Sequence, residues 1–176
     1  MLKATISAAG APRPAPPDDL VGQVQAALQV VARSITQARL HERLLRSAGV
    51  RLDRAGATLL NKLHTGGASL RVTDLAEQLA VDAPTVTRKV QQLERDGLVT
   101  RHADPDDRRA TRITLTAAGR RTLDKVLRAR RAWLSHLLDG WDDAELATFA
   151  TLLGRFSSAL EHDIAPEHDM DGDRGN

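Results

Sequence analysis

Hydroxyl and cationic side chains are concentrated in two short stretches of the 176-residue sequence. They are Thr85, Thr87, Arg88 and Lys89 in the first stretch and Arg108 and Arg109 in the second. Side chains of these types donate hydrogen bonds to phosphate oxygens and to acceptor atoms on base edges. We expect the two stretches to bind a polyanion if the fold places them on one surface. Taken singly, each cation is better explained as part of a solvated protein face.

The charge distribution supports a polyanion partner, although the net charge is only +2. Residues 88–131 contain 13 Lys or Arg against 6 Asp or Glu, whereas residues 161–176 contain 6 acids and one arginine. A basic middle with an acidic end favours nucleic acid as the partner. The alternative is a soluble surface whose charge is merely uneven.

Other chemistries find little support in the sequence. There is no cysteine, which excludes thiolate metal sites and thiol-based redox switches. No P-loop, G-x-S-x-G or H-E-x-x-H pattern is present, and the six histidines show no metal-ligand spacing. We therefore expect no enzyme activity, no metal and no cofactor. No apolar run approaches the ~20 residues of a membrane span, and the N-terminus lacks a signal-peptide pattern, so we predict a cytoplasmic protein.

The first cationic stretch lies in a predicted helix-turn-helix. "VTDLAEQLA" (72–80) reads as a short helix, and Asp82 is suited to cap a second helix that begins with Pro84 in its first turn. Val86 and Val90 face inward in this second helix, while the hydroxyl and cationic side chains point out. Val81 is expected to fill the turn between the two helices.

The second cationic stretch lies at the tip of a predicted two-stranded ribbon. Residues 98–101 and 111–115 alternate in polarity, and turn-forming residues separate them. Arg101 and Arg112 lie on this ribbon, where contact with phosphate and simple solvation of the strand are equally good interpretations. Asp106 or Asp107 is expected to pair with one tip arginine and to orient it.

Long helices flank these elements. Apolar residues spaced by three and four positions run from Val21 to Ala38, which predicts one helix from Asp19 to near Gly49. A second long helix is expected after Thr116, and a last stripe runs from Leu146 to Leu160. Narrow stripes of this kind usually face another helix, often one from a second chain.

The stretches "DLAEQLAVDAPTVTRKVQQLERDGLVTR" and "DPDDRRATRITLTAAG" resemble the MarR family of winged helix-turn-helix transcriptional regulators. The resemblance implies a mainly α fold with a small β-wing, in which a winged helix-turn-helix lobe is flanked by long dimerisation helices. We predict the following domains: 1–17, a disordered N-terminal arm; 18–50 and 117–163, a helical dimerisation region; 52–116, the DNA-binding lobe; 164–176, an acidic flexible tail.

The same resemblance implies a function and a set of site residues. The chain would be a homodimeric, ligand-responsive repressor that binds a pseudo-palindromic operator in double-stranded DNA. Thr85, Thr87, Arg88 and Lys89 would be recognition-helix contacts, and Arg109, with Arg108 beside it, would be the wing-tip arginine. A small-molecule effector would bind where the first, second and fifth helices meet, with His41, Leu63, His64 and Arg120 as candidate lining residues. The alternative function is a winged-helix protein-interaction module without specific DNA binding.

Overall fold

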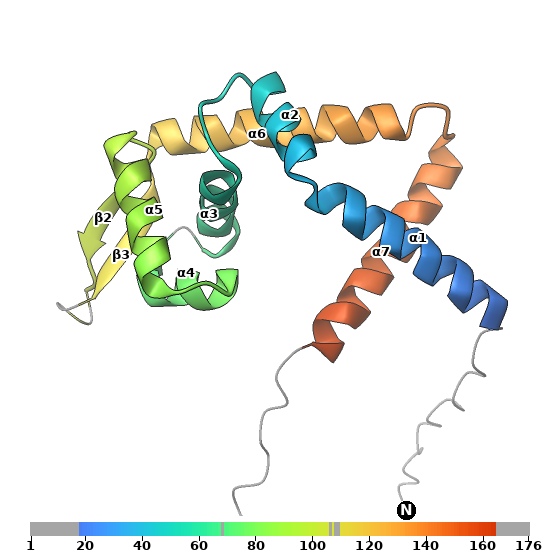
Figure 1. Cartoon of the computed structure of the whole chain (residues 1–176), viewed down its shortest axis with the longest axis horizontal. Helices are drawn as coiled ribbons and strands as arrows, with labels where there is room; N and C mark the ends of the chain where they lie inside the picture. Colours follow the sequence, from blue (N-terminus) through green and yellow to red (C-terminus); the bar gives the residue numbers. More distant parts are fainter. Residues whose placement is uncertain (1–17, 68, 106, 108–109, 165–176) are drawn as a thin grey trace, which may run out of the picture. The chain divides into compact units, whose positions relative to one another are not determined.

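The computed structural model describes residues 18–67, 69–105, 107 and 110–164. These residues form a mainly helical chain with one small sheet, as predicted (Figure 1). The elements are α1 (Asp18–Thr36), α2 (Ala38–Ser47), α3 (Arg54–Thr65), β1 (Ser69–Arg71), α4 (Val72–Leu79), α5 (Ala83–Arg95), β2 (Val99–Ala103), β3 (Thr111–Leu115), α6 (Ala117–Leu137) and α7 (Asp143–Asp163). The predicted N-terminal arm and all but the first residue of the predicted acidic tail lie outside the described residues.

The helix expected from Asp19 to near Gly49 is two helices, because the chain is extended at Gln37 (φ −63°, ψ 127°). The carbonyl of Thr36, freed at this break, accepts a hydrogen bond from Nη1 of Arg54 at 3.1 Å. The Thr36 hydroxyl donates to the carbonyl of Ala32 at 2.7 Å. The second helix does end where expected, since Gly49 has a left-handed φ of +64°.

The lobe formed by α3, α4, α5 and the sheet has a closed aliphatic core. Its fully buried members include Leu59, Leu60, Leu63, Leu75, Val86, Val90, Leu93 and Ile113. Burial of each such side chain contributes roughly 1.5–3 kcal/mol relative to leaving it exposed, which suffices to hold short helices that are individually marginal. Asp53 caps α3 as predicted, because Oδ1 accepts from the backbone N–H of Gly56 at 2.8 Å.

The sheet has three antiparallel strands in the order β1-β3-β2, and not the two that the sequence predicted. Leu70 pairs with Ile113, and Val99 pairs with Leu115. The strand β1 was missed because three residues are too few to show an alternating pattern. The strand β1 leads directly into α4 and is hydrogen-bonded to β3, the central strand of the sheet.

The division between the two compact units of the chain falls inside α6, between Ala129 and Arg130. The first turns of α6 belong to the lobe, where Leu123 and Val126 are buried. Gly119 lies so close to the lobe that a Cβ atom there would stand 2.0 Å from the carbonyl oxygen of Leu98. The sequence placed the whole of 117–163 in the helical region, whereas the packing assigns its start to the lobe.

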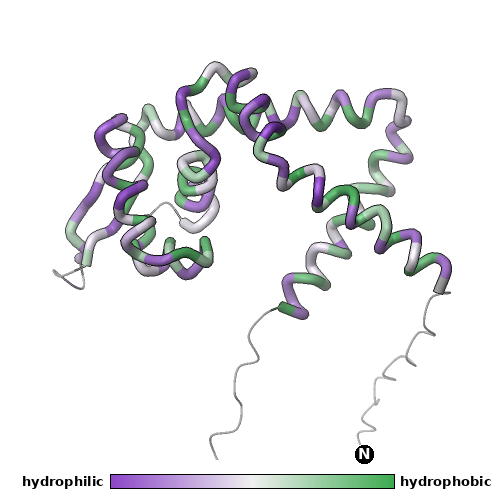
Figure 2. The backbone as a smooth tube through the Cα atoms, viewed as in Figure 1, coloured by the Kyte–Doolittle hydropathy of each residue, from purple (hydrophilic) through white to green (hydrophobic). Residues whose placement is uncertain are grey.

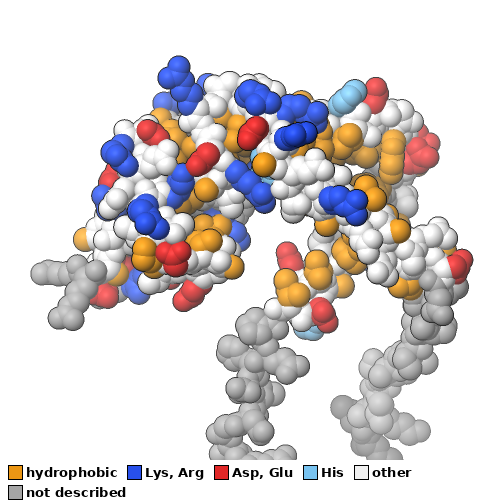
Figure 3. Space-filling view, in the orientation of Figure 1, with side chains coloured by type: hydrophobic (Ala, Val, Ile, Leu, Met, Phe, Trp, Pro, Cys, Tyr) orange, Lys and Arg blue, Asp and Glu red, His pale blue; other side chains and the backbone are white. Residues whose placement is uncertain are grey.

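Two other helices have no buried side chains within this chain. The described side chains of α1 and α7 are all exposed or partly exposed. Apolar residues recur along both helices (Figure 2). On α7, Phe149, Leu153 and Phe156 are 41–46% exposed, and apolar side chains are visible on it in the space-filling view (Figure 3). None of the described helices is both long and apolar enough to cross a membrane.

Candidate nucleic-acid interface

The turn between α4 and α5 is held by the backbone. Ala80 adopts a left-handed conformation (φ 51°, ψ 45°), and the N–H of Val81 donates to the carbonyl of Ala76 at 3.1 Å. The side chain of Val81 does not fill the turn as expected, since it is 43% exposed. The backbone geometry therefore sets the angle at which α5 leaves α4.

The first turn of α5 presents hydroxyl and cationic groups on its exposed side. Asp82 caps the helix, with Oδ1 accepting from the N–H of Thr85 at 2.9 Å and Oδ2 from the Thr85 hydroxyl at 2.8 Å. These bonds, the hydroxyl bond first, hold the pKa of the Asp82 carboxyl below its ordinary value. Nη2 of Arg88 in turn donates to the Thr85 hydroxyl oxygen at 3.2 Å. The exposed guanidinium of Arg88 is thus braced against the helix start.

Thr87 and Lys89 are less available than the sequence suggested. Thr87 is half-buried, and its hydroxyl donates to the carbonyl of Ala83 at 2.8 Å. The Lys89 side chain is only 20% exposed, and its Nζ bonds Oδ2 of Asp53 at 2.6 Å and Oε1 of Gln92 at 2.8 Å. Lys89 therefore links α5 to the start of α3. The expectation that its side chain points out into solvent was wrong.

The hydrogen bond from Lys89 also lowers the pKa of the Asp53 carboxyl. Burial alone would raise its pKa, but the hydrogen bonds from Lys89 and from the backbone of Gly56 outweigh that effect and lower it. The ionised carboxylate consequently serves both as the cap of α3 and as the partner of α5.

The two arginines predicted on the ribbon, Arg101 and Arg112, are both paired. Arg101 forms an ion pair with Glu94 of α5, which raises the pKa of the Arg101 guanidinium. Nε of Arg112 donates to Oδ2 of Asp104 at 2.8 Å. Arg108, Arg109 and Asp106 lie outside the described residues, so the predicted wing-tip contacts stay predictions.

Asp104 is a structural residue that the sequence analysis missed. Its side chain is 1% exposed, and its Oδ2 also accepts from Nε of Arg71 at 2.7 Å. The expected pairing of Asp106 or Asp107 with a tip arginine is a separate contact and stays a prediction, because Asp106, Arg108 and Arg109 lie outside the described residues. No local pattern links Asp104 to Arg71, which lies 33 residues earlier and on β1.

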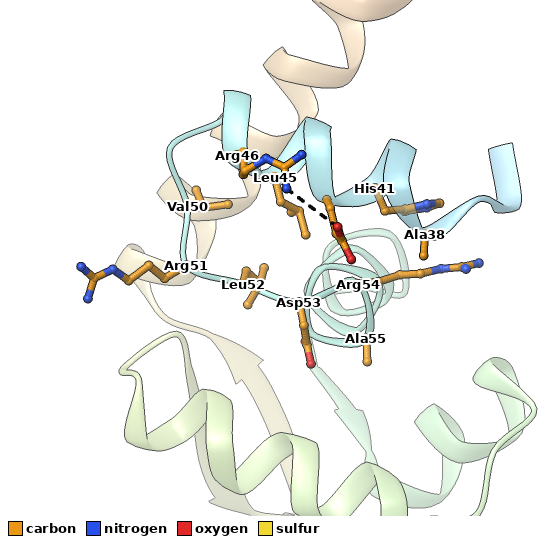
Figure 4. Close-up of a pocket in the computed structure, with 11 residues that line it drawn as sticks. Ala38, His41, Leu45, Arg46, Val50, Arg51, Leu52, Asp53, Arg54 and Ala55 are labelled. Carbon is orange, nitrogen blue, oxygen red and sulfur yellow. Dashed lines mark ion pairs between the residues drawn. The ribbon is translucent and has the colours of Figure 1, made fainter. Parts of the chain in front are cut away.

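The four residues proposed to line an effector site differ in their exposure. Leu63 is 0% exposed within the lobe core and offers no surface to a ligand, whereas His64 and Arg120 are exposed. A cavity of about 500 Å³ does lie between α2 and the start of α3, and His41 lines it (Figure 4). The sequence analysis missed its other lining residues: Ala38, Glu42, Leu45, Arg46, Val50, Arg51, Leu52, Asp53, Arg54 and Ala55. No group of three metal-ligating side chains occurs among the residues that the structure describes.

A family model and two relatives match this chain. The model of the MarR family matches residues 54–111, from α3 to the start of β3. The HTH-type transcriptional regulator YxaD of Bacillus subtilis (strain 168) is 32% identical over 109 residues, which cover 62% of this chain and 76% of YxaD. The HTH-type transcriptional repressor MdtR of the same organism is 27% identical over 151 residues, which cover 83% and 91% of the two chains.

Solved structures agree with the fold. A MarR family protein from Bacillus stearothermophilus superposes with a TM-score of 0.72 at 23% identity, covering 83% of this chain and 99% of that one. Streptococcus pneumoniae FabT, solved in complex with DNA, superposes with a TM-score of 0.61 at 20% identity, covering 81% and 98%. A braced recognition helix, a wing on its flank and these matches lead to one conclusion: the chain belongs to the MarR family and is a transcriptional regulator with a winged helix-turn-helix fold, not an enzyme.

Proposed function

We propose that this chain is a homodimeric repressor that binds a pseudo-palindromic operator in double-stranded DNA and responds to a small-molecule effector. The observation that carries the proposal is the first two turns of α5, where Arg88 is exposed and hydrogen-bonded to Thr85. Similarity to FabT, which was solved in complex with DNA, and to the transcriptional repressor MdtR supports the proposal.

Arg88 is the residue best placed to read a base. A guanidinium has five N–H donors, and the bond to Thr85 engages only one end of the fork. An arginine of this kind can donate two bonds to O6 and N7 of guanine in the major groove. The helix terminus itself is a weaker phosphate site, because the Asp82 carboxylate already occupies it. We therefore assign Arg88 to base readout and Thr85 and Thr87 to supporting contacts.

The remaining cations contribute in different ways. Arg108 and Arg109 are proposed to enter the adjacent minor groove, where the negative potential is greatest. Arg101 and Arg112 are proposed to act on DNA mainly through long-range electrostatic attraction, since each is already paired with a carboxylate. Lys89 is proposed to hold α5 against α3 while lying near the DNA. Phosphate neutralisation should make the affinity fall steeply as salt rises.

The homodimer is supported by the uncovered apolar stripes of α1 and α7. Side chains such as Leu28, Leu153 and Phe156 are about 38–46% exposed within one chain, which is costly for a stripe several turns long. A two-fold dimer would cover these stripes and would present two α5 helices to half-sites roughly 10 bp apart.

The effector is proposed to bind in the cavity between α2 and α3. His41, Arg46 and Arg54 supply polar and cationic groups there, and Leu45 and Leu52 supply apolar surface. Asp53 lines the same cavity and also bonds Lys89 of α5, so a ligand that displaced Asp53 would disturb the recognition helix. Glu42 lines the same cavity and pairs with Arg46 at 3.8 Å, so the lining favours a small molecule with both polar and apolar parts.

Binding to a duplex selected from a random DNA pool tests the proposal. Arg88→Ala should weaken binding by roughly 1–3 kcal/mol and relax the preference at one base pair of each half-site. Arg95→Ala, at the last turn of the same helix, removes the same charge and should lower affinity slightly for all sequences. Equal loss on every sequence for Arg88→Ala would reassign this residue to phosphate.

A salt-titrated anisotropy measurement with the wild-type protein distinguishes the alternative. A protein-interaction module would show weak binding with no preference for the selected duplex over a scrambled one. A sequence-specific regulator should bind its selected site 10³-fold or more tightly than scrambled DNA, on the order expected for specific protein–DNA complexes.

A further inference from the structure

We propose that Asp104 is the positioning residue of the wing, which fixes the wing relative to the helix-turn-helix and thereby sets the aim of the arginines at 108 and 109. The proposal rests on the proposed function, because it concerns how the wing contacts DNA. It assigns a role to the one buried charged side chain among the residues that the structure describes.

The Asp104 carboxylate joins three segments. Its Oδ2 accepts from Nε of Arg71, at the start of α4, and from Nε of Arg112 on β3, at 2.7 and 2.8 Å. Its Oδ1 accepts from the backbone N–H of Asp107 at 3.2 Å. The carboxylate therefore bonds the helix-turn-helix, the central strand and the wing loop at once.

The backbone closes the wing loop around the same residue. The N–H of Asp104 donates to the carbonyl of Ala110 at 3.0 Å, and the N–H of Ala110 donates to the carbonyl of Asp107 at 2.9 Å. The two chain segments that lead to residues 108 and 109 thus begin from positions fixed by Asp104.

The arrangement of the two arginines explains why an acid is needed. Arg71 and Arg112 are paired directly across β1 and β3. Like charges opposite one another on adjacent strands are destabilising, and the Asp104 carboxylate between them reverses the sign of that interaction. Without it, two guanidiniums that are about one-third exposed would repel each other at the base of the wing.

The same charges argue against a direct DNA contact as the main role of this cluster. Arg112 also donates to the carbonyl of Ser69 at 3.4 Å, and the backbone N–H of Arg71 donates to Asp74 at 3.1 Å. Both arginines are committed to bonds inside the protein, and the nearby Asp74 and Asp107 offset much of their charge. Geometry, and not phosphate attraction, is what the cluster supplies.

The test is a double-mutant cycle on the full-length protein and its selected duplex. Asp104→Asn keeps the shape of the side chain and removes its charge, and it should weaken binding about tenfold and reduce the salt slope. In an Arg108→Ala/Arg109→Ala background the same change should have almost no further effect, because the residues it aims are gone. An equal loss in both backgrounds would overturn the proposal, as would wild-type affinity in Asp104→Asn.

Two further variants keep the test decisive. Arg112→Lys retains the charge but loses the planar fork, and it should show a smaller loss with the same dependence on residues 108 and 109; this variant carries the test if Asp104→Asn does not fold. Glu94→Gln makes the same charge change in the exposed pair with Arg101 and should not weaken binding. If wild-type protein shows no preference for any duplex, the proposed function fails. If wild type is selective and Arg88→Ala relaxes it while Asp104→Asn binds normally, only the positioning role of Asp104 fails.

Discussion

The lobe and the long helices α1 and α7 differ in how far their apolar side chains are buried within one chain. In the lobe, Leu60, Leu63 and Ile113 are 0% exposed within a single chain. On α1 and α7, apolar side chains of similar size, such as Ile35 and Leu160, are both 48% exposed. The lobe thus completes its own core, whereas the apolar side chains of α1 and α7 are left exposed.

This difference separates two kinds of stability. Unfolding of the lobe should depend on contacts inside one chain, and so should not depend on protein concentration. If the proposed homodimer covers the α1 and α7 stripes, their burial should follow mass action and depend on protein concentration.

Leu63→Ala should cost the lobe about 2–5 kcal/mol of unfolding free energy, because it opens a cavity in a close-packed core. Equilibrium unfolding in urea measures the loss. Leu152→Ala, on α7 at 53% exposure, is the matched control and should cost far less within the same chain. Comparable losses would mean that the core of the lobe is not self-contained.

Leu153→Asp should convert the protein to a monomer while the lobe stays folded. A carboxylate at the centre of an apolar interface should weaken association by about 100-fold, or roughly 2.7 kcal/mol. Sedimentation over a range of concentrations gives the dissociation constant, and circular dichroism reports the helices. A dimer of unchanged affinity would show that α7 does not form the interface.

Lowering the pH should weaken the lobe through Asp82 and Asp53. Both carboxyls have folded-state pKa values below the ordinary 3.8, so their contribution is complete above that pH and is lost as the pH falls through the lower folded-state values. Thermal unfolding between pH 5 and about pH 2.5 measures this change. Asp82→Asn keeps a cap side chain without a titrating group and should flatten the profile. An unchanged profile in that variant would remove Asp82 from the acid response.

The features that the sequence predicted correctly depend on residues close together in the chain. Asp53 and Asp82 lie three residues before the N–H groups that they cap, and Ile113 and Leu115 alternate on one strand. The exposed face of α5 followed from the same kind of local spacing, and it correctly placed Thr85 and Arg88 at the surface.

The features that the sequence did not reveal depend on contacts between distant residues. Lys89 pairs with Asp53 across 36 positions, and Arg54 bonds Thr36 across 18. A lysine on a polar helix face looks solvated until the fold brings a carboxylate to it. The break at Gln37 likewise lies in an unbroken apolar stripe, and it is matched by a hydrogen bond from another helix. The contacts of Lys89 and Arg54 could not be predicted, because they depend on which distant residues the fold brings together and not on the periodicity of the sequence.

The close approach at Gly119 limits which parts of α6 can change. The atom nearest to a Cβ added at Gly119 is a backbone oxygen and not a movable side chain. The contact between α6 and Leu98 therefore leaves no room for a side chain at this position. A saturation library at position 119 should therefore return only glycine among folded clones. Substitutions in α6 should instead be tolerated farther along the helix, at exposed positions such as Leu134 and Leu137.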